Sequence, residues 1–172
     1  MTLPDSGLLA IRGRANPWHG RQVLAFAVAL VLLVTSNAWA SLGDAESSID
    51  TDRAHIHASR NISAGPHYSV HDLKSADGGR IREYVGRNGV VFAVTWNTQY
   101  KPDLSTLLGK SYPAYAQSAM EAAQRSGIKR QFRHDGLDLV VHSTSHLHVF
   151  SGYSFLRAML PPGFSLDQLG SE

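Results

Sequence analysis

The sequence predicts an α+β fold, in which an antiparallel sheet of about five or six strands carries one main helix. Three observations lead to this fold class. Residues 90–96 form a β-branched and aromatic run that is typical of a strand buried on both faces. Asn88-Gly89, just before this run, is the strongest short-range hairpin signal, because a type I′ turn needs positive φ at both central residues. Residues 113–126 have the apolar periodicity of a helix, and Gly127 follows them.

The first strands are expected to follow one another as a meander. Residues 67–73 alternate in the manner of a strand, and residues 75–79 are rich in Gly and polar side chains, which predicts a turn. Residues 80–85 return as a second strand, and the Asn88-Gly89 turn leads to a third. These connections are too short for parallel crossovers, so the strands are expected to pair antiparallel.

Helices and further strands are expected in the second half of the chain. Asp103 is placed to cap a short apolar turn over residues 104–108. The Ala-rich face of the helix at residues 113–126 is expected to pack on the sheet. The later segments expected to form strands or short apolar turns are residues 128–133, 137–143, 146–153, 155–160 and 164–170.

The N-terminal segment has the three parts of a secretory signal peptide. Basic residues precede an unbroken apolar run of 12 residues at 23–34, and Ala38 and Ala40 form an A-x-A cleavage site. The alternative is an uncleaved membrane anchor. Twelve residues span about 18 Å as a helix, which is short of a bilayer core of roughly 30 Å. Cleavage after Ala40 is therefore expected, and with it no stable membrane span.

The predicted organisation has three parts. Residues 1–40 are the signal peptide, residues 41–66 are an extended N-terminal arm with at most a short helical turn, and residues 67–172 are a single α+β domain. There is no internal repeat or low-complexity linker.

Charge and cysteine content exclude several function classes. The segment 1–40 holds three Arg and one Asp, so it accounts for the whole formal net charge of +2. The remaining chain is balanced and shows no basic excess for nucleic-acid binding. The chain has no Cys, so disulfides, thiolate metal sites and a Cys nucleophile are excluded. No Arg-Arg pair precedes the apolar run, which favours Sec-type export to the periplasm, or secretion, in a Gram-negative bacterium.

Histidines suggest a metal-binding alternative. His146 and His148 would point to one side of a strand, and His142 would lie near them if the last two strands pair. Neutral imidazoles so placed hold Zn, Cu or Ni. No carboxylate or thiolate completes a recognisable ligand spacing, so solvent-exposed strand histidines are the default interpretation and no cofactor is predicted.

Aromatic side chains suggest a binding surface. If Tyr84 and Trp96 are exposed on one face of the sheet, they form a platform for a peptide or glycan, with Arg82 beside it. The alternative is that both belong to the core. The serines lack a G-x-S-x-G motif and the histidines lack an H-E-x-x-H motif, so enzyme activity is uncertain and not favoured.

Several short segments carry a family resemblance. They are Arg82-Glu83-Tyr84-Val85, Gly89-Val90-Val91-Phe92-Ala93-Val94, Trp96, Pro102-Asp103-Leu104, Leu107-Leu108-Gly109, Gly152, Leu156, Leu160-Pro161 and Gly163. In these segments the chain resembles the exported proteobacterial family known as domain of unknown function 2844. The resemblance implies an exported single domain, and it implies no activity, cofactor or functional residue.

The sequence therefore predicts an exported, non-enzymatic binding or envelope accessory module, whose partner is another exported or envelope protein. A histidine-dependent periplasmic metal-binding protein is the first alternative, and a hydrolase of unrecognised type is the second.

Overall fold

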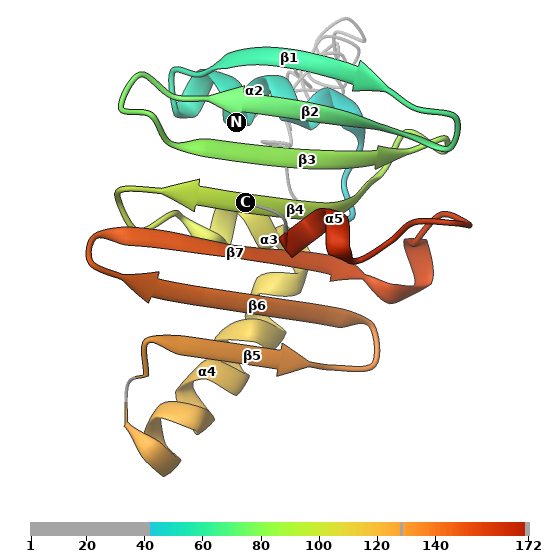
Figure 1. The fold of residues 1–172 in the computed structure, drawn as a ribbon. Helices are drawn as coiled ribbons and strands as arrows, with labels where there is room; N and C mark the ends of the chain where they lie inside the picture. The colour runs from blue at the N-terminus through green and yellow to red at the C-terminus, as the bar shows by residue number, and fades with distance from the viewer. Residues whose placement is uncertain (1–41, 128, 171–172) are drawn as a thin grey trace, which may run out of the picture. The chain divides into compact units, whose positions relative to one another are not determined.

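The computed structural model describes residues 42–127 and 129–170, and its centre is one antiparallel sheet (Figure 1). The strands lie in the order β1-β2-β3-β4-β7-β6-β5. Their bounds are β1 Ser59–Ala64, β2 Tyr68–Lys74, β3 Arg80–Gly86, β4 Val91–Thr98, β5 Gln131–Asp135, β6 Leu139–His146 and β7 Val149–Leu156. The predicted α+β class and antiparallel pairing are confirmed, with seven strands rather than five or six.

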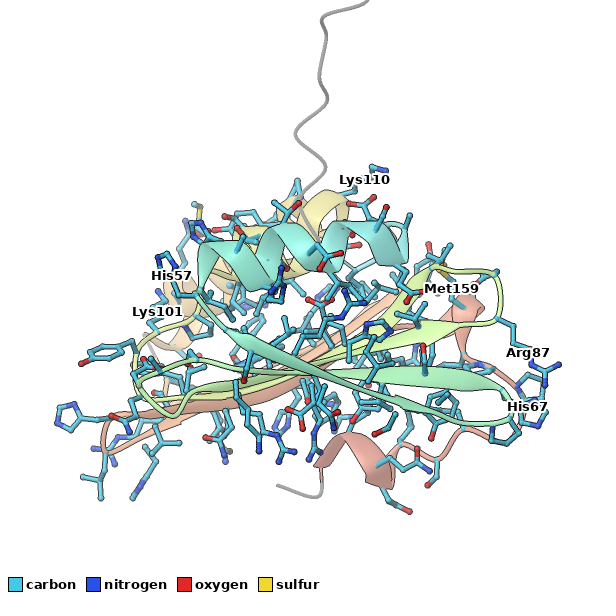
Figure 2. All side chains as sticks on the ribbon, turned by 90° about the horizontal axis from the view of Figure 1, so that it is seen from above. His57, His67, Arg87, Lys101, Lys110 and Met159 are labelled. Atoms are coloured by element: carbon cyan, nitrogen blue, oxygen red, sulfur yellow. The ribbon has the colours of Figure 1, made fainter. Side chains whose placement is uncertain are left out.

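Helices cover the two faces of the sheet unequally. The described helices are η1 Glu46–Ser48, α2 Ile49–His55, α3 Leu104–Leu108, η2 Gly109–Ser111, α4 Tyr112–Ser126, η3 Arg157–Met159 and α5 Asp167–Gly170. Figures 1 and 2 show α2, α3 and α4 on one face, here called the helix face, and the short α5 on the other, here called the α5 face. After β4 the chain crosses the helix face through α3 and α4, and it re-enters the sheet at the far edge as β5.

The predicted extended arm is replaced by α2 and β1. β1 pairs with β2 over six residue pairs, from Ser59↔Lys74 to Ala64↔Ser69. Most of its residues are exposed, because it is an edge strand with a polar sequence. Ile49, the first residue of α2, is fully buried, so this helix belongs to the core.

β4 is the most buried strand, as residues 90–96 predicted. Its residues from Val91 to Trp96 are at most 3% exposed. Val94 and Trp96 belong to the hydrophobic cluster on the helix face, whereas Phe92 and Ala93 belong to the cluster on the α5 face. Phe92 and Ala93 are consecutive residues that share one face of the sheet. They can do so because the β3–β4 pairing shifts register at Tyr84/Val85.

The turn between β3 and β4 differs from the predicted type I′ turn. Only Gly89 has positive φ, at 71°, while Asn88 does not. Gly89 N donates to Gly86 O at 2.9 Å, and Gly86 N donates to Val90 O at 3.0 Å. This is a turn followed by a glycine in the left-handed region, the arrangement of a longer hairpin loop with a bulge.

Trp96 on β4 stands directly opposite Gly152 on β7. A Cβ at position 152 would lie 2.5 Å from the Trp96 ring and 2.3 Å from the backbone oxygen of His142. The indole therefore occupies the space that any other residue at 152 would fill. The backbone oxygen cannot move aside without disturbing the β6–β7 pairing.

We expect Gly152→Ala to lower the free energy of unfolding by about 1–3 kcal/mol, because the added methyl group overpacks this junction. Urea denaturation measures the change. Gly170→Ala is the matched control, since a Cβ there meets nothing within 4 Å. Equal stability of the two variants would contradict the close packing of Trp96 on β7.

Candidate functional site

A cavity of about 410 Å³ lies between α4 and the sheet, and it is called the α4 cavity below. Its size is in the range of small-molecule sites. It is lined by Trp96, Lys101, Pro102, Leu104, Tyr115, Ala119, Ala122, Ala123, Ser126, Gly127, Lys129, Arg130, Gln131, Phe132, Ser143, Thr144, Ser145 and Phe150.

The cavity exists because α4 turns short side chains toward the sheet. Ala119, Ala122 and Ala123 line it, and none of the residues of α4 is fully buried. The predicted packing of α4 on the sheet is made instead by Tyr112 and Tyr115, which contact the core cluster of the helix face. The alanine part of the helix leaves a space that no described side chain fills.

Aromatic and aliphatic side chains form the walls. Trp96, Phe132 and Phe150 come from the sheet, and Leu104 comes from α3. Tyr115 lies on one side of the cavity. Its ring packs edge-to-face against the ring of Phe132, and the two ring centroids are 5.4 Å apart. Burial raises the pKa of the Tyr115 phenol, and a hydrogen bond with Ser143 opposes this shift.

Positive charge surrounds the mouth of the cavity. Lys101, Lys129 and Arg130 are exposed and line it, and no Asp or Glu is among the described lining residues. Within the described part of the chain, none of these three cations forms an ion pair.

A second cleft, of about 480 Å³, lies at the C-terminal end of α2 and is called the α2 cleft. It shares Lys101 and Pro102 with the α4 cavity, so this short segment separates the two. Figure 2 shows Lys101 close to His57 at this end of the sheet. The buried Asp52 carboxylate reaches the cleft from α2, but the other acids of its lining, Asp77 and Asp103, are engaged in their own turns and caps.

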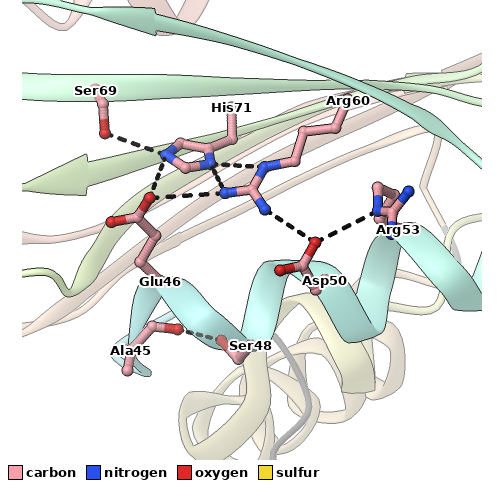
Figure 3. Close-up of polar contacts among 8 residues, drawn as sticks. All are labelled: Ala45, Glu46, Ser48, Asp50, Arg53, Arg60, Ser69 and His71. Atoms are coloured by element: carbon pink, nitrogen blue, oxygen red, sulfur yellow. Dashed lines mark hydrogen bonds and ion pairs between the residues drawn. The ribbon is translucent and has the colours of Figure 1, made fainter.

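A polar network fastens α2 and η1 to the sheet (Figure 3). Arg60 on β1 donates to Nδ1 of His71 at 3.0 Å and to Asp50 at 3.0 Å, and it lies 3.6 Å from Glu46. Because Nδ1 accepts from Arg60, the neutral ring carries its proton on Nε2. Nε2 faces Glu46 at 3.3 Å and Ser69 at 3.1 Å. Burial, followed by the charge of Arg60, lowers the pKa of His71.

Glu83 and Asp52 form a buried carboxyl pair beside this network. Glu83 stands opposite His71 in the β2–β3 pairing, and the two carboxyl side chains are 1% and 3% exposed. Burial raises the pKa of Glu83 most strongly, the charge and hydrogen bond of Asp52 raise it further, and Arg60 opposes them. Protonation of Glu83 would remove the repulsion between the two buried carboxylates.

The aromatic platform expected from Arg82, Tyr84 and Trp96 does not form. Tyr84 and Trp96 are each 3% exposed, and they belong to the clusters on opposite faces of the sheet. The Tyr84 hydroxyl donates to the backbone oxygen of Gln168 at 3.3 Å, under the C-terminal segment. Arg82 lies 3.9 Å from Asp72. Trp96 instead forms part of the α4 cavity.

The three late histidines do not converge. His146 ends β6, and His148 lies in the following turn, where it and Leu147 have positive φ. His142 and His146 share a strand face, but four residues of strand separate them by about 13 Å. Among the described residues no group of three His, Asp or Glu is placed to hold a metal ion.

Sequence reasoning did not find the residues of the α4 cavity as a site. The periodic alanines were a visible signal, but they equally predict a closely packed helix. Lys101, Lys129 and Arg130 come from two separate connections and share no motif. Ala38, Ala40 and the rest of the expected signal peptide lie outside the described residues. None of the described helices is long and apolar enough to cross a membrane.

We expect Glu83→Gln to stabilise the protein at pH 8 by at least about 1 kcal/mol, and not at pH 4. Because the pKa of Glu83 is raised, the folded protein keeps a proton on this carboxyl group at pH values where the unfolded chain has released it. The unfolded chain releases it at the ordinary glutamate pKa of 4.5. The wild-type protein therefore has its full stability from Glu83 at low pH. It loses this contribution as the pH rises from the pKa of Glu83 in the unfolded chain toward the higher pKa of Glu83 in the folded protein.

Urea denaturation between pH 4 and pH 8 checks this result, with the exposed Glu121→Gln as a control. His71 titrates in wild type and variant alike, so its contribution cancels in the difference. A stability difference that does not change with pH would show that Glu83 does not hold the proton.

Comparison with known proteins identifies the family and nothing more specific. Neither a search of curated proteins nor a search of solved structures found a match. The sequence model of the family described as "Protein of unknown function (DUF2844)" matches residues 38–169, which is more than three quarters of the chain. The predicted resemblance is thereby confirmed, and the chain belongs to the DUF2844 family.

Proposed function

We propose that the protein is an exported, non-enzymatic binding protein of the bacterial envelope, which holds the apolar part of a small ligand in the α4 cavity. One observation carries this proposal. A helix of 15 residues crosses the sheet without burying any residue fully, and the space beneath its alanines is walled by aromatic side chains. An apolar cavity of this kind gains free energy when a ligand replaces its water.

The chemistry of the cavity lining supports binding rather than catalysis. Its ionisable groups in the described residues are Tyr115 and the three cations at the mouth. Among the described lining residues, no carboxylate or histidine accompanies Ser126, Ser143 and Ser145 to act as a general base for a serine nucleophile.

The N-terminal sequence supports export. A basic segment, an apolar run of 12 residues and an A-x-A site precede the region that the family shares, which begins at residue 38. Residues 41–172 contain equal numbers of acidic and basic residues and no Cys.

Blocking the cavity tests the binding function. Ala122→Trp places an indole in the space under α4, and Ala114→Trp places the same group on an exposed position of the same helix outside the lining. We expect the neutral dye Nile red to bind the wild type and the Ala114 variant with similar affinity. The Ala122 variant should bind at least about tenfold more weakly, because a filled cavity offers no apolar surface.

Fluorescence titration measures the three affinities, and circular dichroism confirms that both variants fold. Equal Nile red binding by all three proteins would show that the dye binds elsewhere and that the α4 cavity is not the site.

Export is tested on the protein produced in a Gram-negative host. We expect the mass of the protein released from the periplasm to correspond to a chain that starts at Ser41, because Ala38 and Ala40 define the cleavage site. A full-length mass in the membrane fraction would indicate an uncleaved anchor. Ala40→Pro is a useful companion variant, since it should block cleavage.

A further inference from the structure

We infer that the ligand of the α4 cavity is an anionic amphiphile, a molecule with one carboxylate or phosphate head on an apolar body. This inference rests on the proposed function and adds the chemical class of the ligand. The apolar body would lie among Trp96, Phe132 and Phe150, and the anionic head would remain at the mouth.

The charged residues at the mouth of the α4 cavity are all positive. Lys101, Lys129 and Arg130 supply three positive charges, and no acid among the described lining residues offsets them. Elsewhere on the surface, cations are commonly paired: Lys110 lies 2.9 Å from Asp44, and Arg133 lies 3.2 Å from Asp135. Cations that form no ion pair with another described residue, and that lie beside an apolar cavity, are complementary to a ligand that brings its own negative charge.

The three cations come from two separate connections of the chain. Lys101 lies in the connection before α3, and Lys129 and Arg130 lie in the connection after α4. All three are exposed, so their charges are hydrated and cost no desolvation. A head group held there stays partly hydrated, while the body of the ligand leaves water. This division matches the two ends of an amphiphile.

The neighbouring α2 cleft is lined by acidic residues, unlike the described lining of the α4 cavity, and this difference bears on where the anionic head of the ligand would lie. Its described lining contains Asp52, Asp77 and Asp103 together with His55 and His57, and it shares Lys101 and Pro102 with the α4 cavity. With three acids in its lining, the α2 cleft is therefore less favourable for an anionic head than the mouth formed by the three cations. The head-group position is fixed by charge, and the body position is fixed by apolar surface.

Three probes of equal chain length test the assignment. Dodecanoate, dodecanol and dodecylammonium are titrated by calorimetry below their aggregation concentrations. We expect dodecanoate to bind roughly tenfold more tightly than dodecanol, and dodecylammonium to bind more weakly than dodecanol. Raising the salt concentration should weaken only the binding of dodecanoate toward that of dodecanol, because exposed charges are screened.

Paired substitutions supply the control. Lys129→Gln with Arg130→Gln should reduce dodecanoate affinity by about fivefold and leave dodecanol affinity unchanged. Lys74→Gln with Arg125→Gln removes the same charge from exposed positions outside the cavity, and it should change neither affinity. Trp96 fluorescence reports entry into the cavity. In the exported chain it is the one tryptophan after residue 40, and Trp18→Phe with Trp39→Phe isolates it in the full-length chain.

The outcomes separate the two proposals. Equal affinities for dodecanoate and dodecanol, both abolished by Ala122→Trp, would overturn the anionic head group and leave the cavity as an apolar site. Absence of binding by all three probes would overturn both proposals. Binding to phosphatidylglycerol vesicles without binding of monomeric dodecanoate would overturn the cavity ligand in favour of a membrane surface.

Discussion

The junction of β4 with β7 is the constraint on which the rest of the structure depends. β1 to β4 form one half of the sheet, β5 to β7 form the other, and the two halves meet through this single strand pair. Trp96 fills the space above Gly152, so the strands approach closely on the helix face. Because β7 occupies the place beside β4, the chain leaving β4 has to cross the sheet to reach the far edge. α3 and α4 are this crossing, and the α4 cavity lies beneath it.

The sequence predicted those elements whose signals are local. The buried strand β4, the presence of a hairpin turn at Gly89 though not its type, the Asp103 cap and the end of α4 at Gly127 depend on neighbouring residues only. β1 was missed because a polar edge strand is stabilised by the backbone of β2 rather than by its own apolar pattern. Its pairing is a tertiary effect that no window of the sequence contains.

The failure of the aromatic platform has a similar cause. Whether two aromatic residues on neighbouring strands share a face depends on pairing register, and here Trp96 pairs with Ile81 while Tyr84 pairs with Ala93. Register is fixed by the turn and by the irregularity at Tyr84/Val85, and neither can be read from composition or periodicity. The α4 cavity could not be predicted for a comparable reason. Alanine spacing defines a helix face, but the height of that face above the sheet is set by Tyr112 and Tyr115.

The two main helices of the helix face are held by different physical interactions. α2 is fastened by the ionic network of Arg60 and Asp50 and by the buried pair of Asp52 and Glu83, so lifting it would expose charges from several elements at once. α4 rests on aromatic contacts near its N-terminal end, and its remaining inward residues are alanines above a cavity. Local opening costs least where few buried contacts are broken. The C-terminal half of α4 is therefore the part of the helix face that can yield to a ligand, while α2 and the β4–β7 junction keep the sheet in place.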